Sequence, residues 1–302
     1  MSNKSILITG GTGFLGSALT FKCLHQQYQV TVFSRSSDKV IRAFGNQVQA
    51  ITRIEDLPDA GSFDVVVNLA GAGIFDQRWN EARKQVLRDS RIVLTQQLVD
   101  WIKHSSGRPG VLINGSAIGI YGEQGDLALT ENSQPKADFS QQLCADWEQA
   151  ALEAKESGTR VCLIRTGLVL GQDGGLLKRM LLPFRMGLGG RLGNGQQWIS
   201  WIHLQDWLAI AQLLIEDPNL QGAYNATAPS PVSNQEFSAT LASVLNRPML
   251  MPLPEALLKV ILGEMAALVL GSQKVLPQRL LDAGFQFQHT QLESALRDIL
   301  KS

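Results

Sequence analysis

The chain has few cysteines and no long apolar segment, and both absences narrow the kind of protein it can be. Its 302 residues contain only three cysteines, Cys23, Cys144 and Cys162, which are scattered and form no CxxC pair. This pattern is typical of a reducing compartment and offers no metal-ligand spacing, so we predict no metal site. The most apolar late stretch, residues 256–270, contains Lys259 and Glu264 and is too short to span a bilayer. Because the first residues also lack a signal-peptide pattern, we expect a cytoplasmic protein without a membrane partner.

An excess of charge of either sign is also absent. The 27 basic and 27 acidic residues give a formal net charge of zero, so no overall attraction draws the chain to nucleic acid. The short basic run of Lys178, Arg179 and Arg185 makes no basic face, and we predict no nucleic-acid partner. Hydrophobic residues make up 44% and charged residues 18% of the chain, which is the ordinary composition of a globular protein.

The first half of the chain alternates short apolar runs with longer amphipathic ones. The runs are rich in β-branched residues and are predicted strands, at residues 5–9, 29–33, 64–69, 111–114 and 161–166. Residues 15–27 and 80–104 between them are predicted helices. Strands that alternate with helices favour right-handed crossovers. The fold class we predict is therefore α/β, a doubly wound parallel sheet of the Rossmann type.

A glycine pattern between the first strand and the first helix predicts a phosphate-binding loop. Gly10, Gly13 and Gly16 have the spacing TGxxGxxG. The first permits a tight turn, the second lets the backbone approach a pyrophosphate, and the third allows close packing of helix on strand. The free amides of the following helix attract phosphate. We predict a dinucleotide bound by Gly10, Thr12, Gly13, Phe14, Leu15 and Gly16.

The end of the second strand indicates which dinucleotide is bound. NAD enzymes usually place an acid there, which binds the adenosine ribose. This chain instead has Ser34, Arg35 and Ser36, with no acid before Asp38. The Arg35 guanidinium can bind a 2′-phosphate and the two serines can donate to it, so the sequence predicts NADP(H). The alternative is that Arg35 is a solvated turn residue.

Small residues follow the fourth strand as well. Leu69, Ala70 and Gly71 let the backbone approach the cofactor. Arg78 comes next and can reach a phosphate, although a surface position at a helix start explains it equally well.

The pattern changes after about residue 170, where glycine-rich and tryptophan-rich segments begin. We predict an NADP(H)-binding Rossmann domain at residues 1–170 and a smaller, mostly helical substrate-side region at residues 171–302, interleaved with the core. Ser233 and Glu236 form a capping box that opens one of its helices. The region ends in a helical segment at about residues 248–302, the C-terminal module.

These motifs resemble the extended short-chain dehydrogenase/reductases, the group that includes the nucleotide-sugar epimerases. The similarity is greatest to an atypical, epimerase-like branch with a helical C-terminal module of uncharacterised function. The matching stretches cover nearly the whole chain and are residues 10–16, 68–71, 78–79, 163–171, 181–203, 263–265, 274–278 and 283–287. The resemblance implies NADP(H) binding, a support role for Arg165 around the cofactor, and a small-molecule substrate of unknown identity.

The resemblance also implies a catalytic serine, tyrosine and lysine, of which only the serine is present. Members of the group use a YxxxK pair, in which the lysine lowers the tyrosine pKa for proton exchange with the substrate. Ser116 occupies the serine place. The three tyrosines are Tyr28, Tyr121 and Tyr224, and the residues four positions after them are Val32, Gly125 and Ala228. In the helix where the pair belongs, Phe139 or Ser140 takes the tyrosine place and Leu143 or Cys144 the lysine place.

Two functions are compatible with an intact nucleotide loop and a missing YxxxK. One is an NADP(H)-dependent oxidoreductase or epimerase-like enzyme, in which Ser116 orients the substrate and the proton comes from Tyr121 or from water. The other is a catalytically idle NADP(H)-binding sensor or regulatory protein. We also predict a homodimer in which two chains pair through the helix at residues 80–104.

Overall fold

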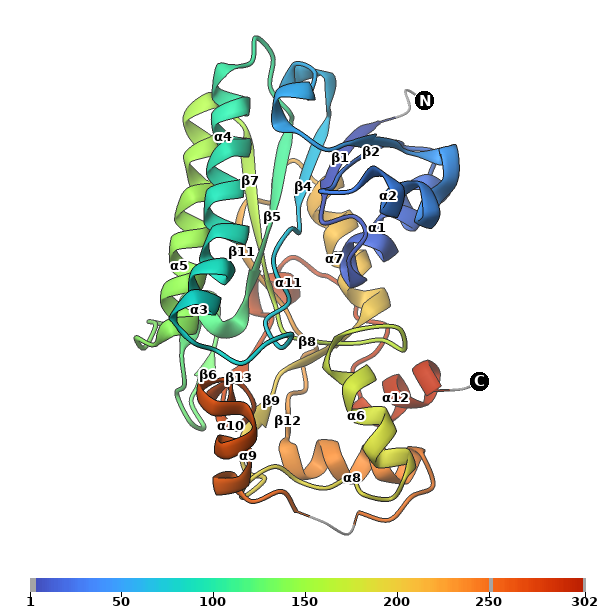
Figure 1. Ribbon diagram of the computed structural model, residues 1–302, viewed down its shortest axis with the longest axis vertical. Coiled ribbons are helices and arrows are strands. Elements are labelled where there is room, and N and C mark those ends of the chain that lie inside the picture. The colour runs from blue at the N-terminus through green and yellow to red at the C-terminus, as the bar shows by residue number, and fades with distance from the viewer. Residues whose placement is uncertain (1–3, 250–251, 301–302) are drawn as a thin grey trace.

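Seven strands form a single parallel sheet at the centre of the molecule (Figure 1). The computed structural model describes residues 4–249 and 252–300. The strands are β1 (Ser5–Thr9), β2 (Gln29–Phe33), β3 (Gln49–Ile51), β4 (Val65–Asn68), β5 (Val111–Ala117), β7 (Arg160–Thr166) and β11 (Gly222–Ala226). Their spatial order is β11-β7-β5-β4-β1-β2-β3, and every pairing is parallel. The predicted doubly wound Rossmann sheet is confirmed.

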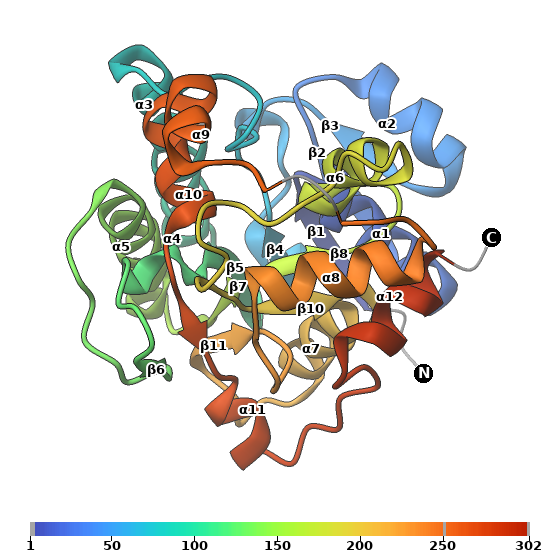
Figure 2. The same cartoon turned by 90° about the horizontal axis from the view of Figure 1, so that it is seen from below.

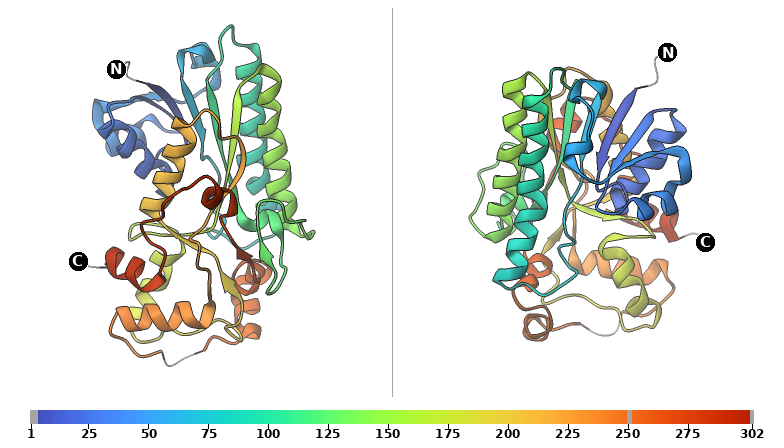
Figure 3. Two further views of the ribbon diagram at one scale, coloured as in Figure 1. Left: turned by 180° about the vertical axis from the view of Figure 1, so that it is seen from behind. Right: turned by 45° about the horizontal axis from the view of Figure 1, so that its top comes forward.

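Helices cover both faces of this sheet (Figure 3, right). One face carries α1 (Phe14–His25), α2 (Ser37–Phe44) and α7 (Leu204–Glu216), and the other carries α3 (Glu81–Arg88), α4 (Leu94–His104) and α5 (Phe139–Leu152). A hydrophobic core lies on each face of the sheet. Successive residues of β1 pack into these two cores alternately, with Ile6 and Ile8 on one face and Leu7 on the other. The near-continuous apolar runs in the sequence are explained by this burial on both faces.

Three differences from the sequence prediction have clear physical causes. The predicted helix at residues 80–104 is helical from Glu81 to His104, with Asn80 as its N-cap, but a π-helical segment, Asp89–Val93, separates α3 from α4. β3 was not predicted, because its three residues include only one buried side chain, Ile51. β11 was not predicted either, because glycine, alanine and asparagine fill four of its five positions.

Most of the remaining short strands and helices lie toward the carboxyl end of the sheet, in the lower part of Figure 1. The short strands are β6 (Ala128–Leu129), β8 (Leu168–Leu170), β9 (Trp198–Ile199), β10 (Trp201–His203), β12 (Val232–Ser233) and β13 (Lys274–Val275). The helices are α6 (Gly175–Arg185), α8 (Asn234–Val244), α9 (Glu255–Leu262), α10 (Ala266–Leu270), α11 (Gln278–Asp282) and α12 (Leu292–Leu300). Short 3-10 helices lie at Gly45–Gln47, Ile54–Asp56, Ala60–Ser62, Ile118–Tyr121, Glu153–Ser157 and Gly263–Met265.

The C-terminal module is joined to the sheet domain by backbone pairing. Strand β13 of the module pairs in parallel with β6, which follows β5 in the chain. The Ser233 hydroxyl accepts a hydrogen bond of 3.1 Å from the amide of Glu236, which confirms the predicted cap of α8. In the described part of the chain, every helix is too short or too polar to cross a lipid bilayer.

Candidate functional site

The glycine loop after β1 presents open backbone amides. Gly10 has a φ of +68°, and a Cβ there would lie 2.6 Å from the carbonyl oxygen of Leu69. A Cβ on Gly16 would collide with the carbonyl oxygen of Gly10. A Cβ on Gly13, by contrast, would meet only the carbonyl oxygen of Gly10, at 3.2 Å, and would otherwise face open space. Gly13 is the N-cap of α1 and offers no side-chain acceptor, so the first helix amides are free for an anion.

The side chain of Phe14 points away from this open space. Gly171 and Gly174 line the place where it packs, since a Cβ on either would meet the Phe14 ring. Leu15 packs against the hydrophobic core between the sheet and the helices α1, α2 and α7. Any contact that Phe14 and Leu15 make with a phosphate therefore comes from their backbone amides, while Thr12 is exposed beside them.

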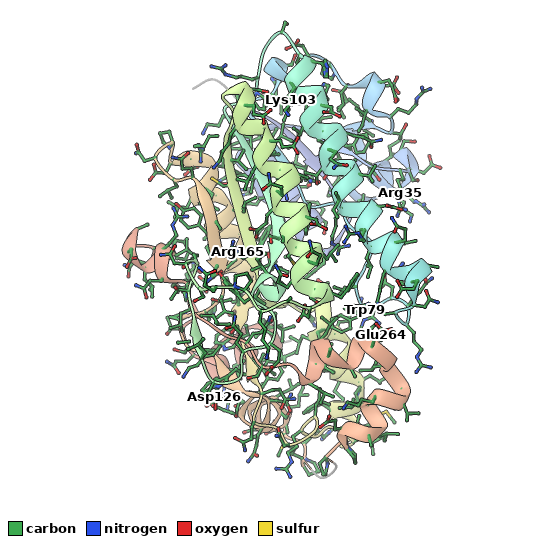
Figure 4. All side chains as sticks on the ribbon, turned by 90° about the vertical axis from the view of Figure 1, so that its left-hand side faces the viewer. Arg35, Trp79, Lys103, Asp126, Arg165 and Glu264 are labelled. Atoms are coloured by element: carbon green, nitrogen blue, oxygen red, sulfur yellow. The ribbon has the colours of Figure 1, made fainter. Side chains whose placement is uncertain are left out.

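The turn after β2 leaves Arg35 exposed. The Ser34 hydroxyl accepts a hydrogen bond of 3.4 Å from the amide of Ser36, and the Ser36 hydroxyl caps α2 by accepting from the amide of Lys39. Among the described residues, the Arg35 guanidinium has no hydrogen-bond or ion-pair partner. It lies on the outer edge of the sheet domain, as Figure 4 shows. The arginine is free to bind a ligand phosphate.

Arginines hold the loop that follows β4. The Arg91 guanidinium, from the π-helical segment, donates to the carbonyl oxygen of Ala72 at 3.1 Å. It lies directly against Gly71, where a Cβ would be 2.9 Å from its central carbon. Burial lowers the Arg91 pKa, and the nearby Arg83 charge lowers it further. The absence of a side chain at Gly71 therefore makes room for a partly buried cation behind the loop.

Arg78 lies at the far end of the same loop. Its guanidinium donates to the carbonyl oxygen of Val260 in the C-terminal module. The structure thus uses Arg78 to dock the module, and its predicted contact with a cofactor phosphate stays a prediction.

The two predicted catalytic residues lie in one buried polar network. The Ser116 hydroxyl donates to Glu148 at 2.6 Å, and Glu148 accepts two hydrogen bonds of 2.9 Å from Arg165. Arg165 also donates to the Tyr121 hydroxyl at 3.0 Å, which itself donates to Asn225 at 2.6 Å. Arg165 supports the loops around the site through these bonds.

This network engages the Tyr121 hydroxyl completely. The side chain is 1% exposed, and burial raises its pKa in spite of the Arg165 charge. A phenol with a raised pKa is a poorer base near neutral pH than an ordinary tyrosine.

The helix that carries YxxxK in related reductases places a different residue at the surface here. Ser140 lies next to Gly119 of the loop after β5, and both line a cleft of about 370 Å³. Cys144, one turn further along α5, is buried, and this burial raises its pKa to about 12. Neither position supplies the acid and cation pair.

The cleft lies between the sheet domain and the C-terminal module. Trp79 and Phe139 form an edge-to-face aromatic pair in its wall, with ring centroids 5.0 Å apart. The module contributes Glu264, Leu268 and Gln273 from the opposite side. Figure 4 shows Trp79 and Glu264 next to each other at this junction. Ligands of open α/β sheets bind at this carboxyl end of the strands.

A possible metal cluster lies elsewhere, at α12. Within the described residues, His203, His289 and Asp298 have potential ligand atoms within 4.8 Å of one another. However, His203 Nδ1 accepts a hydrogen bond of 3.1 Å from the Gln205 amide and so caps α7. The proton of the neutral ring is then on Nε2, the atom that faces Asp298 at 3.4 Å. A metal would have to displace this proton, so the arrangement favours a structural role for His203.

Three residues of the site were not identified from the sequence. Glu148 and Arg91 were overlooked because nothing local distinguishes them from other helix residues. A buried-strand arginine such as Arg165 requires a carboxylate partner, and that requirement was the available signal for Glu148. Glu264 was noted only as a charge in an apolar stretch, and its place in the cleft depends on how the module docks.

Comparison with known proteins agrees with this geometry. The family model described as "NAD dependent epimerase/dehydratase family" matches residues 6–226, and a domain of unknown function, DUF1731, matches residues 253–299. The chain is 39% identical over 306 residues to the chloroplastic "Epimerase family protein SDR39U1 homolog" of Arabidopsis thaliana, covering 99% of this chain and 88% of that one. It is 40% identical over 309 residues to epimerase family protein Mb2239 of Mycobacterium bovis, covering 98% and 97%.

Solved structures are similar over the whole chain. The human epimerase family protein SDR39U1 (isoform 2), crystallised with NADPH, has a TM-score of 0.90 and 34% identity, and the match covers 99% of each chain. The UDP-glucose 4-epimerase of Thermus thermophilus has a TM-score of 0.76 at 16% identity, covering 98% of each chain, and shares the fold. On this evidence the chain belongs to the NAD-dependent epimerase/dehydratase family of extended short-chain dehydrogenase/reductases and carries the DUF1731 module at its C-terminal end.

Proposed function

We propose that this protein is an NADP(H)-dependent oxidoreductase or epimerase-like enzyme that acts on a small molecule in the cleft beside Ser140. The open glycine loop carries the proposal, because the uncapped amides after Gly13 offer a site for a pyrophosphate. The human relative that contains NADPH, with a TM-score of 0.90, supports the same cofactor here. The free guanidinium of Arg35 favours NADP(H) over NAD(H).

NADPH, when bound, supplies a hydride for a carbonyl carbon of the substrate. The protein must orient the carbonyl oxygen and provide a proton for it. Ser140 lines the cleft, and its hydroxyl can donate a hydrogen bond to such an oxygen. Ser116 was the sequence-based choice for this role, but its hydroxyl proton is engaged by Glu148.

The proton source follows from the same geometry. The Tyr121 hydroxyl donates to Asn225 and faces the interior of the network. We therefore assign the proton to water in the cleft, with the reductive direction favoured because no residue of the cleft is a strong base near neutral pH. Glu148 and Arg165 act as supports that hold the side chains of Ser116 and Tyr121 in place.

A second function has one observation in its favour. Both predicted catalytic residues, Ser116 and Tyr121, have their hydroxyl protons committed to buried partners. A catalytically idle NADP(H) sensor would need only the nucleotide site. Its function would not be impaired by hydrogen bonds that hold the Ser116 and Tyr121 hydroxyl protons in the interior.

A screen of aldehydes and ketones with NADPH tests the enzyme against the sensor. We expect NADPH oxidation that Tyr121→Phe largely retains and that Ser140→Ala lowers by about 100-fold or more, the loss typical of a missing hydrogen bond to a developing oxyanion. Circular dichroism of each variant checks the fold. Tight NADPH binding without turnover of any carbonyl compound would contradict the enzyme and favour the sensor. A rate that falls in Tyr121→Phe and not in Ser140→Ala would show that Tyr121, rather than water, donates the proton.

A further inference from the structure

The hydrogen-bonding character of the cleft indicates what class of molecule it accepts. This step rests on the proposed function, since it concerns the substrate of the same site. The cleft has an aromatic wall of Trp79 and Phe139 and a volume of about 370 Å³, which is in the range of small-molecule sites. Its polar side chains come from the loop after β5, from the start of α5 and from the C-terminal module.

Nearly all polar side-chain atoms that line the cleft are hydrogen-bond acceptors. Glu123, Asp138 and Glu264 contribute carboxylates. The side-chain amide nitrogen of Gln273 donates to the carbonyl oxygens of Ile118, at 3.2 Å, and Gly122, at 2.8 Å. Its amide oxygen therefore remains as an acceptor for a ligand.

The donors of the lining are few by comparison. The indole N–H of Trp79 already donates to the carbonyl oxygen of Ile74, at 3.1 Å. Among the lining side chains, all within the described residues, there is no lysine, arginine or histidine. The Ser140 hydroxyl is therefore the single side-chain donor that the cleft offers.

The lysines near the cleft compensate its charge only in part. Lys84 pairs with Glu264 at 2.6 Å, and Lys136 pairs with Glu123 at 3.4 Å. Asp138 pairs with no cation among the described residues and instead caps α5 by accepting from the Gln141 amide at 2.7 Å. A phosphate or carboxylate in the cleft would face acceptors and an uncompensated negative charge, and repulsion between the like charges would oppose its binding.

From this lining we infer that the cleft binds a small molecule that pairs an aromatic or apolar part with hydrogen-bond donors, an ammonium or hydroxyl groups, and that it rejects nucleoside diphosphates and other polyanions. The apolar part packs on Trp79 and Phe139, and the donors reach the carboxylates. This distinguishes the chain from the related solved enzymes that act on UDP-sugars, such as the Thermus UDP-glucose 4-epimerase.

A matched set of aryl ketones tests the inference by calorimetric titration of the NADPH-saturated protein. The probes are 4-acetylbenzylamine, 4-acetylbenzyl alcohol and 4-acetylbenzoate, which differ only in the para group, together with UDP-glucose. We expect the amine to bind about tenfold or more tightly than the benzoate, since a unit charge several ångströms from a carboxylate contributes on this order in a partly solvated site. The alcohol should lie between them, and UDP-glucose should bind more weakly than the neutral alcohol.

Variants link the preference to the cleft. Glu123→Gln combined with Glu264→Gln should reduce the amine-to-benzoate ratio to about threefold or less. Glu153→Gln is the matched control, because Glu153 also pairs with a lysine, Lys103, at the opposite end of the molecule (Figure 4). It should leave the ratio unchanged.

Three outcomes would overturn the inference: equal or tighter binding of the benzoate or of UDP-glucose, a ratio that the double variant does not change, or no binding of any probe at millimolar concentration. A separate titration with NADPH alone tests the proposed function. Loss of that binding would show that the cofactor assignment, rather than the substrate class, is wrong.

Discussion

The buried Glu148–Arg165 pair gives a quantitative prediction for stability. The two side chains are 8% and 13% exposed, and two hydrogen bonds of 2.9 Å join them. Glu148→Gln keeps the shape and removes the charge, so the Arg165 guanidinium is left buried without a counter-ion. Breaking a buried pair in this way typically costs about 3–5 kcal/mol. For a chain of 302 residues, this corresponds to a fall of roughly 5–8 °C in the melting temperature.

The assay is urea unfolding of wild type, Glu148→Gln, Arg165→Met and Glu148→Gln/Arg165→Met. Removal of both charges should cost less than the sum of the two single changes, with a coupling of about 2 kcal/mol or more. Glu153→Gln, which breaks a more exposed pair of 3.3 Å with Lys103, should cost less than about 1 kcal/mol. If Glu148→Gln behaved like Glu153→Gln, the buried network would not contribute to stability and the supporting role of Glu148 and Arg165 would be refuted.

Four further predictions concern the cofactor, the pH and assembly. Arg35→Asp should weaken NADPH binding by about 1.5–3 kcal/mol and remove the preference over NADH in calorimetry, and equal wild-type affinities for the two would contradict the assignment. Gly13→Val should abolish NADPH binding while circular dichroism stays native, because the side chain fills the space where the pyrophosphate approaches; unchanged binding would limit the glycine to a turn role. Burial, and then the charge of His289, lower the His203 pKa below its ordinary 6.5, so the contribution of His203 to the free energy of unfolding should be constant above pH 6.5 and fall as the pH drops below it. His203→Asn keeps a helix-capping side chain and should flatten that fall, and an unaltered profile would exclude His203 as its source. If the chain pairs through residues 80–104, Val86→Glu with Val93→Glu, at side chains 46% and 43% exposed, should convert a dimer to a monomer in sedimentation, whereas a wild-type monomer would remove this proposal.

The features that depend on local sequence were predictable. The glycine spacing, the β-branched runs and the Ser233 cap each act within a few residues of the chain, and the structure has the corresponding loop, strands and helix start. The short strands β3 and β11 escaped prediction because pairing with β2 and β7, rather than their own composition, makes them strands.

The arrangement of the site was less predictable because it depends on residues that are distant in the chain. Ser116 and Tyr121 were identified as polar residues near the site, but their partners Glu148 and Asn225 lie 32 and 104 residues away. Likewise, the acceptor-rich character of the cleft arises only when the module brings Glu264 and Gln273 opposite Trp79.

The division of the site between two parts of the chain has a consequence for how such proteins diversify. The residues predicted to bind the dinucleotide in the loops after β1, β2 and β4, from Gly10 to Gly71, precede the first residue of the cleft, Trp79. Figure 2 shows α9 and α10 of the C-terminal module beside α3, separate from α1 and α2. Substitutions in the module can therefore change which ligand fits while the cofactor loops keep their sequence. Relatives with the same nucleotide site need not share a substrate, and exchange of the module between two of them is a direct route to transferring specificity.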